Sequence, residues 1–150
     1  MSNKTLNTET ETLLVGEAIA RNLSPGIFVS LKGDLGAGKT CLARGILRGL
    51  GHTGRVKSPT YPLVEIYHFE NLTVYHFDFY RIADPAEIID AGFREVFNGS
   101  NVCIVEWADK AGEVICEPDI TLSLTINSDS RSLSITSYSD LGKTCSEGIL

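Results

Sequence analysis

The residues best suited to chemistry form one stretch that begins at Gly33 and reads Gly-Asp-Leu-Gly-Ala-Gly-Lys-Thr. It matches the pattern G-x-x-x-x-G-K-S/T of phosphate-binding loops. Gly33, Gly36 and Gly38 allow backbone N–H groups to close around phosphate oxygens in conformations that a Cβ would forbid. Lys39 would bring an ammonium group to the β- and γ-phosphates, and the Thr40 hydroxyl would ligate Mg²⁺. The motif therefore predicts a site for a nucleoside triphosphate and Mg²⁺, with a ligand-free Gly-rich turn as the alternative.

The residues around this stretch favour the phosphate-binding interpretation. An apolar run from Ile27 to Leu31 precedes it, and a helical stripe of Leu42, Ile46 and Leu50 follows it. The motif requires a strand before it and a helix after it, because the helix N-terminus adds N–H groups and a favourable dipole. A second Gly-Lys-Thr begins at Gly142, but Ser137 stands where the first glycine is needed, so we interpret it as a helix start.

Two acidic residues at predicted strand ends are candidates for the chemistry of this site. Glu106 ends the apolar run that begins at Val102, and a carboxylate in that position typically holds Mg²⁺ directly or through water. Asp78 lies among aromatic residues, where an isolated carboxylate would be costly. Asp78 could hold Mg²⁺ or position water, or it could be a buried residue paired with Arg81. Thr60, in a Ser-Pro-Thr segment, could sense the γ-phosphate or simply belong to a turn.

The elements that must position these residues alternate between helical and extended patterns. A helix is expected over 8–23, a hairpin over 63–81, a helix from Asp84, a strand over 101–105, a second hairpin over 120–136 and a short helix over 141–150. We therefore predict an α/β fold of the P-loop NTPase class, with a central, mostly parallel sheet, antiparallel hairpins and flanking helices, as a single domain over 1–150. His76 is interpreted as a packed strand residue, Glu9 as a capping or solvated residue, and Arg131 as a surface residue of a turn.

Composition limits the classes of function. The 150 residues are 43% hydrophobic with a net charge of −6, which argues against a stand-alone nucleic-acid-binding protein. We expect no membrane association, because no apolar run is long enough to span a bilayer and the N-terminus lacks a signal-peptide core. Cys41, Cys103, Cys116 and Cys145 lack C-x-x-C spacing, so we expect reduced thiols in a cytoplasmic protein.

Four motifs in this order resemble the bacterial TsaE family, formerly called YjeE. They are Gly33-Asp34-Leu35-Gly36-Ala37-Gly38-Lys39-Thr40, Ser58-Pro59-Thr60-Tyr61, His76-Phe77-Asp78-Phe79-Tyr80-Arg81 and Glu106-Trp107. The similarity extends over nearly the whole chain, and the family supplies the ATPase of tRNA threonylcarbamoyladenosine synthesis. The resemblance thus implies an ATPase that uses ATP and Mg²⁺.

The resemblance also implies roles for individual residues. It places Thr40 and Glu106 on Mg²⁺ near Asp78, makes Asp78 necessary for hydrolysis and puts Thr60 in a switch-like loop. Two departures from the family pattern are Cys41, where a second Thr is common, and Pro62, where Thr is frequent. The candidate nucleotide-binding residues are Glu9, Gly33, Gly36, Ala37, Gly38, Lys39, Thr40, Cys41, Thr60 and Arg131, and the candidate catalytic residues are Lys39, Asp78 and Glu106.

The family partners a TsaD–TsaB pair, which attaches a threonylcarbamoyl group to the adenosine beside the tRNA anticodon. The resemblance implies such a heterodimer as the partner, with tRNA reached through the complex. A nucleotide-dependent switch with incidental hydrolysis and a small P-loop kinase are the alternatives. A kinase usually needs an Arg-rich lid, whereas residues 83–99 contain one Arg. Guanine specificity is not expected, because Asn3-Lys4-Thr5-Leu6 lacks the final Asp of an N-K-x-D motif.

Overall fold

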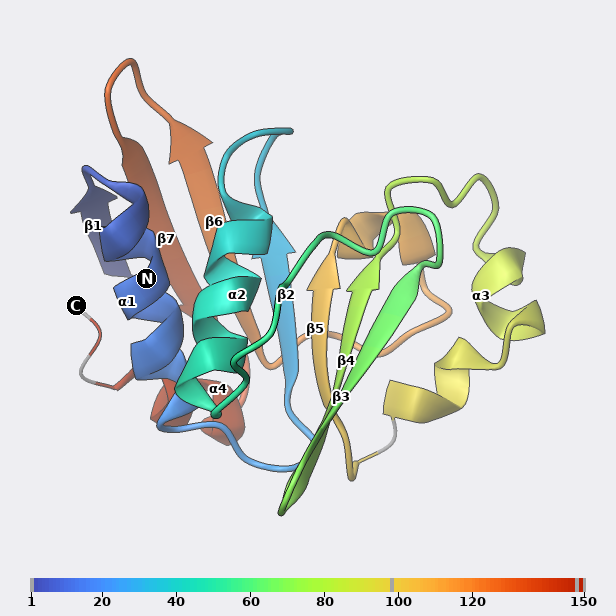
Figure 1. Cartoon of the computed structure of the whole chain (residues 1–150). Coiled ribbons are helices and arrows are strands. Elements are labelled where there is room, and N and C mark those ends of the chain that lie inside the picture. Colours follow the sequence, from blue (N-terminus) through green and yellow to red (C-terminus); the bar gives the residue numbers. More distant parts are fainter. Residues whose placement is uncertain (1, 98, 148, 150) are drawn as a thin grey trace.

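Seven strands form one sheet in the computed structural model, which describes residues 2–97, 99–147 and 149. The spatial order is β1-β7-β6-β2-β5-β4-β3 (Figure 1). The central pairs β6–β2, β2–β5 and β5–β4 are parallel, and the pairs β1–β7, β6–β7 and β3–β4 are antiparallel. The expected parallel centre with antiparallel hairpins is confirmed. The strands are β1 (Ser2–Leu6), β2 (Phe28–Lys32), β3 (Val64–Phe69), β4 (Leu72–Asp78), β5 (Val102–Glu106), β6 (Ile120–Ile126) and β7 (Arg131–Ser137).

Two helices, α1 (Glu9–Ala20) and α2 (Lys39–Gly49), pack against each other on one face of the sheet (Figure 1). The α1 helix starts at a capping box, in which Thr8 accepts from the Glu11 backbone and the Glu11 side chain accepts from Thr8. The two helices approach closely because glycines line the contact. A Cβ on Gly16 would stand 2.6 Å from the carbonyl oxygen of Leu42.

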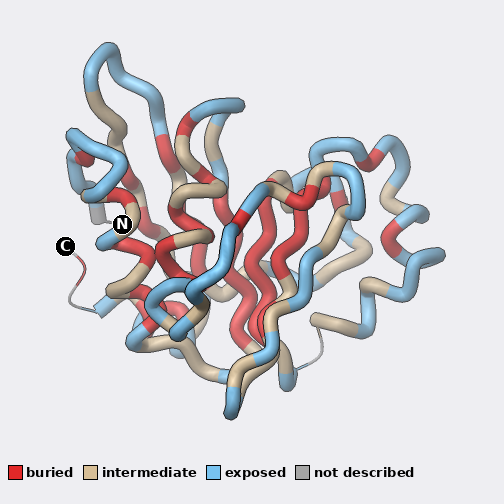
Figure 2. The backbone as a smooth tube through the Cα atoms, viewed as in Figure 1, coloured by how far each residue is buried: buried red, intermediate tan, exposed pale blue. Residues whose placement is uncertain are grey.

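The other face of the sheet carries an aromatic cluster beneath shorter helices. Phe28, Phe77 and Phe79 are buried there, and Phe77 stacks on Phe97 with ring centroids 5.3 Å apart. Figure 2 shows the resulting buried band along the central strands. Within the described residues, no helix combines the length and apolar character that a membrane crossing requires. The remaining helices are α3 (Ala86–Asp90) and α4 (Asp140–Ser146), with 3-10 turns η1 (Phe93–Phe97) and η2 (Ala108–Ala111).

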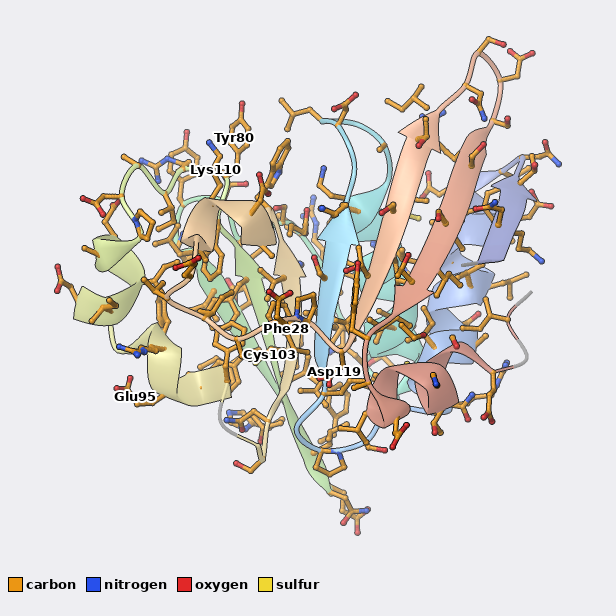
Figure 3. All side chains as sticks on the ribbon, turned by 180° about the vertical axis from the view of Figure 1, so that it is seen from behind. Phe28, Tyr80, Glu95, Cys103, Lys110 and Asp119 are labelled. Atoms are coloured by element: carbon orange, nitrogen blue, oxygen red, sulfur yellow. The ribbon has the colours of Figure 1, made fainter. Side chains whose placement is uncertain are left out.

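Asp119 connects the start of β6 to β2 and α4. Its carboxylate accepts from the backbone N–H of Phe28 at 2.7 Å and from the Ser139 hydroxyl at 2.7 Å. Figure 3 labels Phe28, Cys103 and Asp119 in this part of the molecule. Among the described residues all four cysteines are free, and burial raises the pKa of the Cys103 and Cys145 thiols to about 12.

Several element boundaries differ from those expected. The β1 strand was not predicted, and α1 ends at Ala20 instead of continuing to residue 23. The α3 helix is only five residues long, because Gly92 adopts a φ of +77° and the chain continues as a 3-10 turn. The terminal helix covers Asp140–Ser146, and residues 148 and 150 of the expected 141–150 helix lie outside the described residues.

Candidate nucleotide-binding site

The glycine-rich loop joins the carboxyl end of β2 to the first residue of α2. Gly38 stands at the N-cap of α2 with a φ of 112°, a conformation that favours glycine. A Cβ at Gly33 would meet the carbonyl oxygen of Leu124 at 2.8 Å. Within the described residues no side chain caps α2, so its first N–H groups are available to an anion. The local backbone therefore has the form that phosphate binding needs.

Lys39 is folded back onto its own loop. Its Nζ donates to the carbonyl oxygens of Gly33 and Asp34, the latter at 3.1 Å, and lies 4.5 Å from the centroid of the Trp107 ring. Burial lowers the pKa of the Lys39 ammonium, while the nearby carboxylates of Glu106 and Asp78 act in the opposite direction. A phosphate at the loop would give this partly desolvated ammonium an anionic partner.

Thr40, Glu106 and His76 form a chain of polar contacts beside the loop. The Thr40 hydroxyl donates to the Glu106 carboxylate, with its Oγ1 3.3 Å from each oxygen, and His76 Nε2 lies 2.7 Å from Oε2. Glu106 is only 3% exposed and His76 is fully buried. A hydroxyl and a carboxylate facing each other are oxygen donors of the kind that Mg²⁺ prefers. Thr40 and Glu106 thus fit the ion expected from the sequence.

Asp78 lies next to Glu106, because the two residues are register partners on the parallel strands β4 and β5. Its carboxylate accepts from the hydroxyls of Ser58 and Thr60, the latter at 3.1 Å, and from the backbone N–H of Tyr80 at 2.9 Å. The alternative pairing of Asp78 with Arg81 is wrong, since the Arg81 guanidinium lies over the Tyr61 ring at 4.6 Å. The loop that carries Thr60 is therefore fixed to a candidate catalytic residue.

These groups line one cavity of about 380 Å³ on one side of the loop. Figure 3 labels Tyr80 on its rim, at the end of the sheet where the loop also lies. Among the candidate residues, the cavity is lined by Gly36, Gly38, Lys39, Thr40, Cys41, Thr60, Asp78 and Glu106.

A second cavity of about 250 Å³ touches the same loop. The Arg131 guanidinium reaches into this region and donates to the carbonyl oxygens of Ala37 at 3.1 Å and Gly36 at 3.4 Å. Arg131 was expected to be a surface residue of a turn, but its side chain instead contacts the glycine-rich loop. Glu9 lines the cavity at the start of α1, where its carboxylate lies 3.8 Å from Arg44. Among the candidate residues, this cavity is lined by Glu9, Gly36, Ala37, Gly38, Cys41 and Arg131.

Sequence reasoning missed two features of the site. It treated His76 as a packed strand residue, but the side chain also contacts Glu106. The position of His76 could have indicated this contact. Residues two apart on a strand share a face, and His76 precedes Asp78 by two. Trp107 was not among the candidate site residues, yet it adopts a φ of 62° directly after Glu106 and faces Lys39.

The parallel-centred α/β sheet, with this loop between β2 and α2, defines a P-loop fold. The crystal structure of Bacillus subtilis YdiB is similar, with a TM-score of 0.83 and 28% identity over 99% of this chain and 93% of that one. The family described as threonylcarbamoyl adenosine biosynthesis protein TsaE matches residues 6–134. The chain belongs to the TsaE family.

Individual relatives agree with this assignment. The Haemophilus influenzae protein named tRNA threonylcarbamoyladenosine biosynthesis protein TsaE is 47% identical over 117 residues, covering 78% of this chain and 74% of the relative. The Rickettsia typhi protein of the same name is 40% identical over 130 residues, covering 86% of this chain and 90% of the relative.

Proposed function

We propose that this chain binds ATP with Mg²⁺ and hydrolyses ATP to support threonylcarbamoyl modification of tRNA. The observation that carries the proposal is the convergence of Lys39, Thr40, Asp78 and Glu106 on one cavity beside the loop. A binding loop alone would need only the lysine and the hydroxyl. Two adjacent buried carboxylates are the groups that hydrolysis adds, because they can hold a cation and orient water.

Each residue has a distinct role in the proposal. The loop from Gly33 to Cys41 holds the phosphates through its backbone N–H groups, and Lys39 contacts the β- and γ-phosphates. Thr40 and Glu106 would hold Mg²⁺, which supplies neutralisation of the charge that develops on the phosphates. Asp78 is fixed by two hydroxyls and one N–H, and we assign it to orienting the attacking water beside the metal.

The second cavity is proposed to take the nucleoside end of ATP. Arg131 and Glu9 both border it, and the contacts of Arg131 with the loop carbonyls would hold the β7 turn against the phosphates. GTP should compete poorly, since the sequence lacks the guanine-reading motif.

The relatives' names support a role in tRNA modification. We propose that the chain acts in the cytoplasm on a TsaD–TsaB type heterodimer and reaches tRNA only through that complex. The experiment that tests the function measures ATP turnover by the purified chain alone, with the heterodimer, and with heterodimer and tRNA. We expect slow turnover alone and faster turnover in the complex, whereas no hydrolysis in any mixture would contradict the ATPase assignment.

A nucleotide-dependent switch is the second candidate function. The hydroxyl contact between Thr60 and Asp78 favours it, because a loop fixed to a site carboxylate can change position when the γ-phosphate arrives or leaves. Enhancement of tRNA modification by a non-hydrolysable ATP analogue to the same extent as by ATP would favour the switch over the ATPase.

A further inference from the structure

We propose that His76 is a positioning residue that orients the Glu106 carboxylate toward the cation, an inference that rests on the proposed Mg²⁺·ATP site. His76 is fully buried and does not line the candidate cavity, whereas its hydrogen-bond partner Glu106 does. Its Nε2 is 2.7 Å from Oε2 of Glu106. It would therefore act on the site through Glu106 and not on the nucleotide.

The position of His76 is otherwise an apolar one. On β4 it shares a face with Val74 and Asp78, and on β5 the same face carries Val102 and Ile104, where all three aliphatic side chains are fully buried. A buried imidazole in such surroundings is costly unless its polar atoms are satisfied. Among the described residues, His76 Nδ1 has no hydrogen-bond partner. Packing alone thus gives no reason for a histidine here.

The geometry gives the imidazole a defined direction. A carboxylate only accepts, so Nε2 carries the proton and donates to Oε2. With Nδ1 buried and unpartnered, that bond is the ring's one polar contact among the described residues. The Thr40 hydroxyl approaches the same carboxylate at 3.3 Å from α2. His76 therefore holds Glu106 at Oε2, while Oε1 has only the Thr40 hydroxyl as a partner among the described residues.

This arrangement resembles the way outer hydrogen-bond partners orient metal ligands in proteins generally. Removal of such a partner typically lowers metal affinity or activity by about 10–100-fold. We therefore expect His76→Leu, which continues the apolar column, to raise the Mg²⁺ concentration needed for half-maximal binding of a fluorescent ATP analogue by about 10–100-fold. Binding of the analogue by His76→Leu in EDTA should stay within about twofold of wild type, because the loop contacts remain. A twofold change corresponds to well under 1 kcal/mol.

Two further variants separate positioning from packing. His76→Gln retains an amide donor long enough to reach Glu106 and should recover much of the Mg²⁺ response, whereas His76→Asn is too short and should not. His68→Gln, on the exposed surface of β3, is the matched control and should behave like wild type. Thermal unfolding of each variant reports whether the fold is intact.

The outcomes distinguish this inference from the proposed function. A folded His76→Leu with wild-type Mg²⁺ dependence would overturn the positioning role. If His76→Leu does not fold, equal Mg²⁺ responses of the Gln and Asn variants would overturn it instead. A wild-type chain that binds the analogue with no Mg²⁺ effect at all would show that the proposed function, and not the assignment of His76, has failed.

Discussion

At the scale of single residues, Lys39 makes contacts that a phosphate would replace. Its ammonium is held by two carbonyl oxygens of its own loop and by the face of Trp107. The loop is thus arranged around a cation for which the phosphates of the proposed nucleotide would be the anionic partner. Lys39 also has an internal counterpart, because Lys143 belongs to the second Gly-Lys-Thr but lies exposed in α4.

We predict that Lys39→Ala lowers ATP affinity by about 10–100-fold, since a hydrogen bond to a charged group contributes roughly 1.5–3 kcal/mol. Calorimetric titration with Mg²⁺·ATP measures the loss. Lys143→Ala is the control and should bind like wild type. Unchanged affinity and turnover in Lys39→Ala would contradict the phosphate-binding assignment.

The carboxylates should affect turnover more than binding. We predict that Asp78→Asn and Glu106→Gln each lower kcat by one to several powers of ten while ATP affinity falls much less, because the phosphate contacts remain with the loop. Steady-state ATPase assays combined with equilibrium binding separate the two effects. Asp109→Asn serves as the control, because Asp109 lies outside the cavity that Asp78 and Glu106 line. Normal hydrolysis by either variant would make that residue structural.

Single residues of the candidate site could be predicted from the sequence where they belong to a motif with fixed spacing. The loop residues and the acid at the end of β5 follow from motif and burial pattern. The partners of those residues do not, because they depend on which strands become neighbours. His76 meets Glu106 only because β4 and β5 pair in parallel with Asp78 opposite Glu106. Similarly, Arg131 reaches the loop across 94 positions of sequence, a contact that local patterns cannot predict.

At the scale of elements, α2 follows the glycine-rich loop directly and packs closely against α1. The contact depends on small residues: a Cβ on Gly16 would lie 2.6 Å from the Leu42 carbonyl oxygen and 2.7 Å from the Ile46 nitrogen. Gly45 meets the Leu13 carbonyl in the same way from the α2 side. A larger side chain at Gly16 or Gly45 would have to separate the two helices and displace the loop.

We predict that Gly16→Ala destabilises the chain by up to about 2 kcal/mol. Overpacking a close contact costs about 1–3 kcal/mol, and the gain in helix propensity from glycine to alanine, about 1 kcal/mol, opposes this cost. Chemical denaturation measures the free energy of unfolding. Thr10→Ala, exposed on the same helix, should change it by less than about 0.5 kcal/mol. A stabilised Gly16→Ala would mean that the helices can separate without cost.

The elements differ in how far the sequence predicts them. The central strands and the two hairpins follow from burial and alternation. The β1 strand does not, because Ser2–Leu6 is short and largely polar, with Leu6 as its only strongly apolar residue. It becomes a strand by pairing with β7 at the edge of the sheet, where Leu6 lies opposite Arg131. Tertiary pairing thus decides its conformation.

At the scale of the whole molecule, charge argues for an indirect relation to tRNA. The net charge is −6, and the basic residues that precede the Thr60 loop form one small group, Arg44, Arg48, Arg55 and Lys57. Arg44 is already engaged, since its guanidinium donates to the Val56 carbonyl at 3.2 Å and lies 3.8 Å from Glu9. The exposed remainder of this group is Arg48, Arg55 and Lys57. Such a patch is too small for strong salt-dependent binding of a polyanion by the chain alone.

We therefore predict that ATP hydrolysis by this chain matters for repeated rounds of tRNA modification and not for contact with the base. In a reconstituted assay with a TsaD–TsaB type heterodimer, tRNA and limiting protein, wild type should support many rounds per complex. Lys39→Ala and Asp78→Ala should support about one or fewer, with Lys143→Ala as the matched control. The physical reason is that the Thr60 hydroxyl donates to Asp78, so that we expect cleavage of the γ-phosphate to change the position of the loop that carries Thr60. If both Lys39→Ala and Asp78→Ala support multiple rounds, modification does not depend on ATP hydrolysis by this chain, and the switch function is favoured.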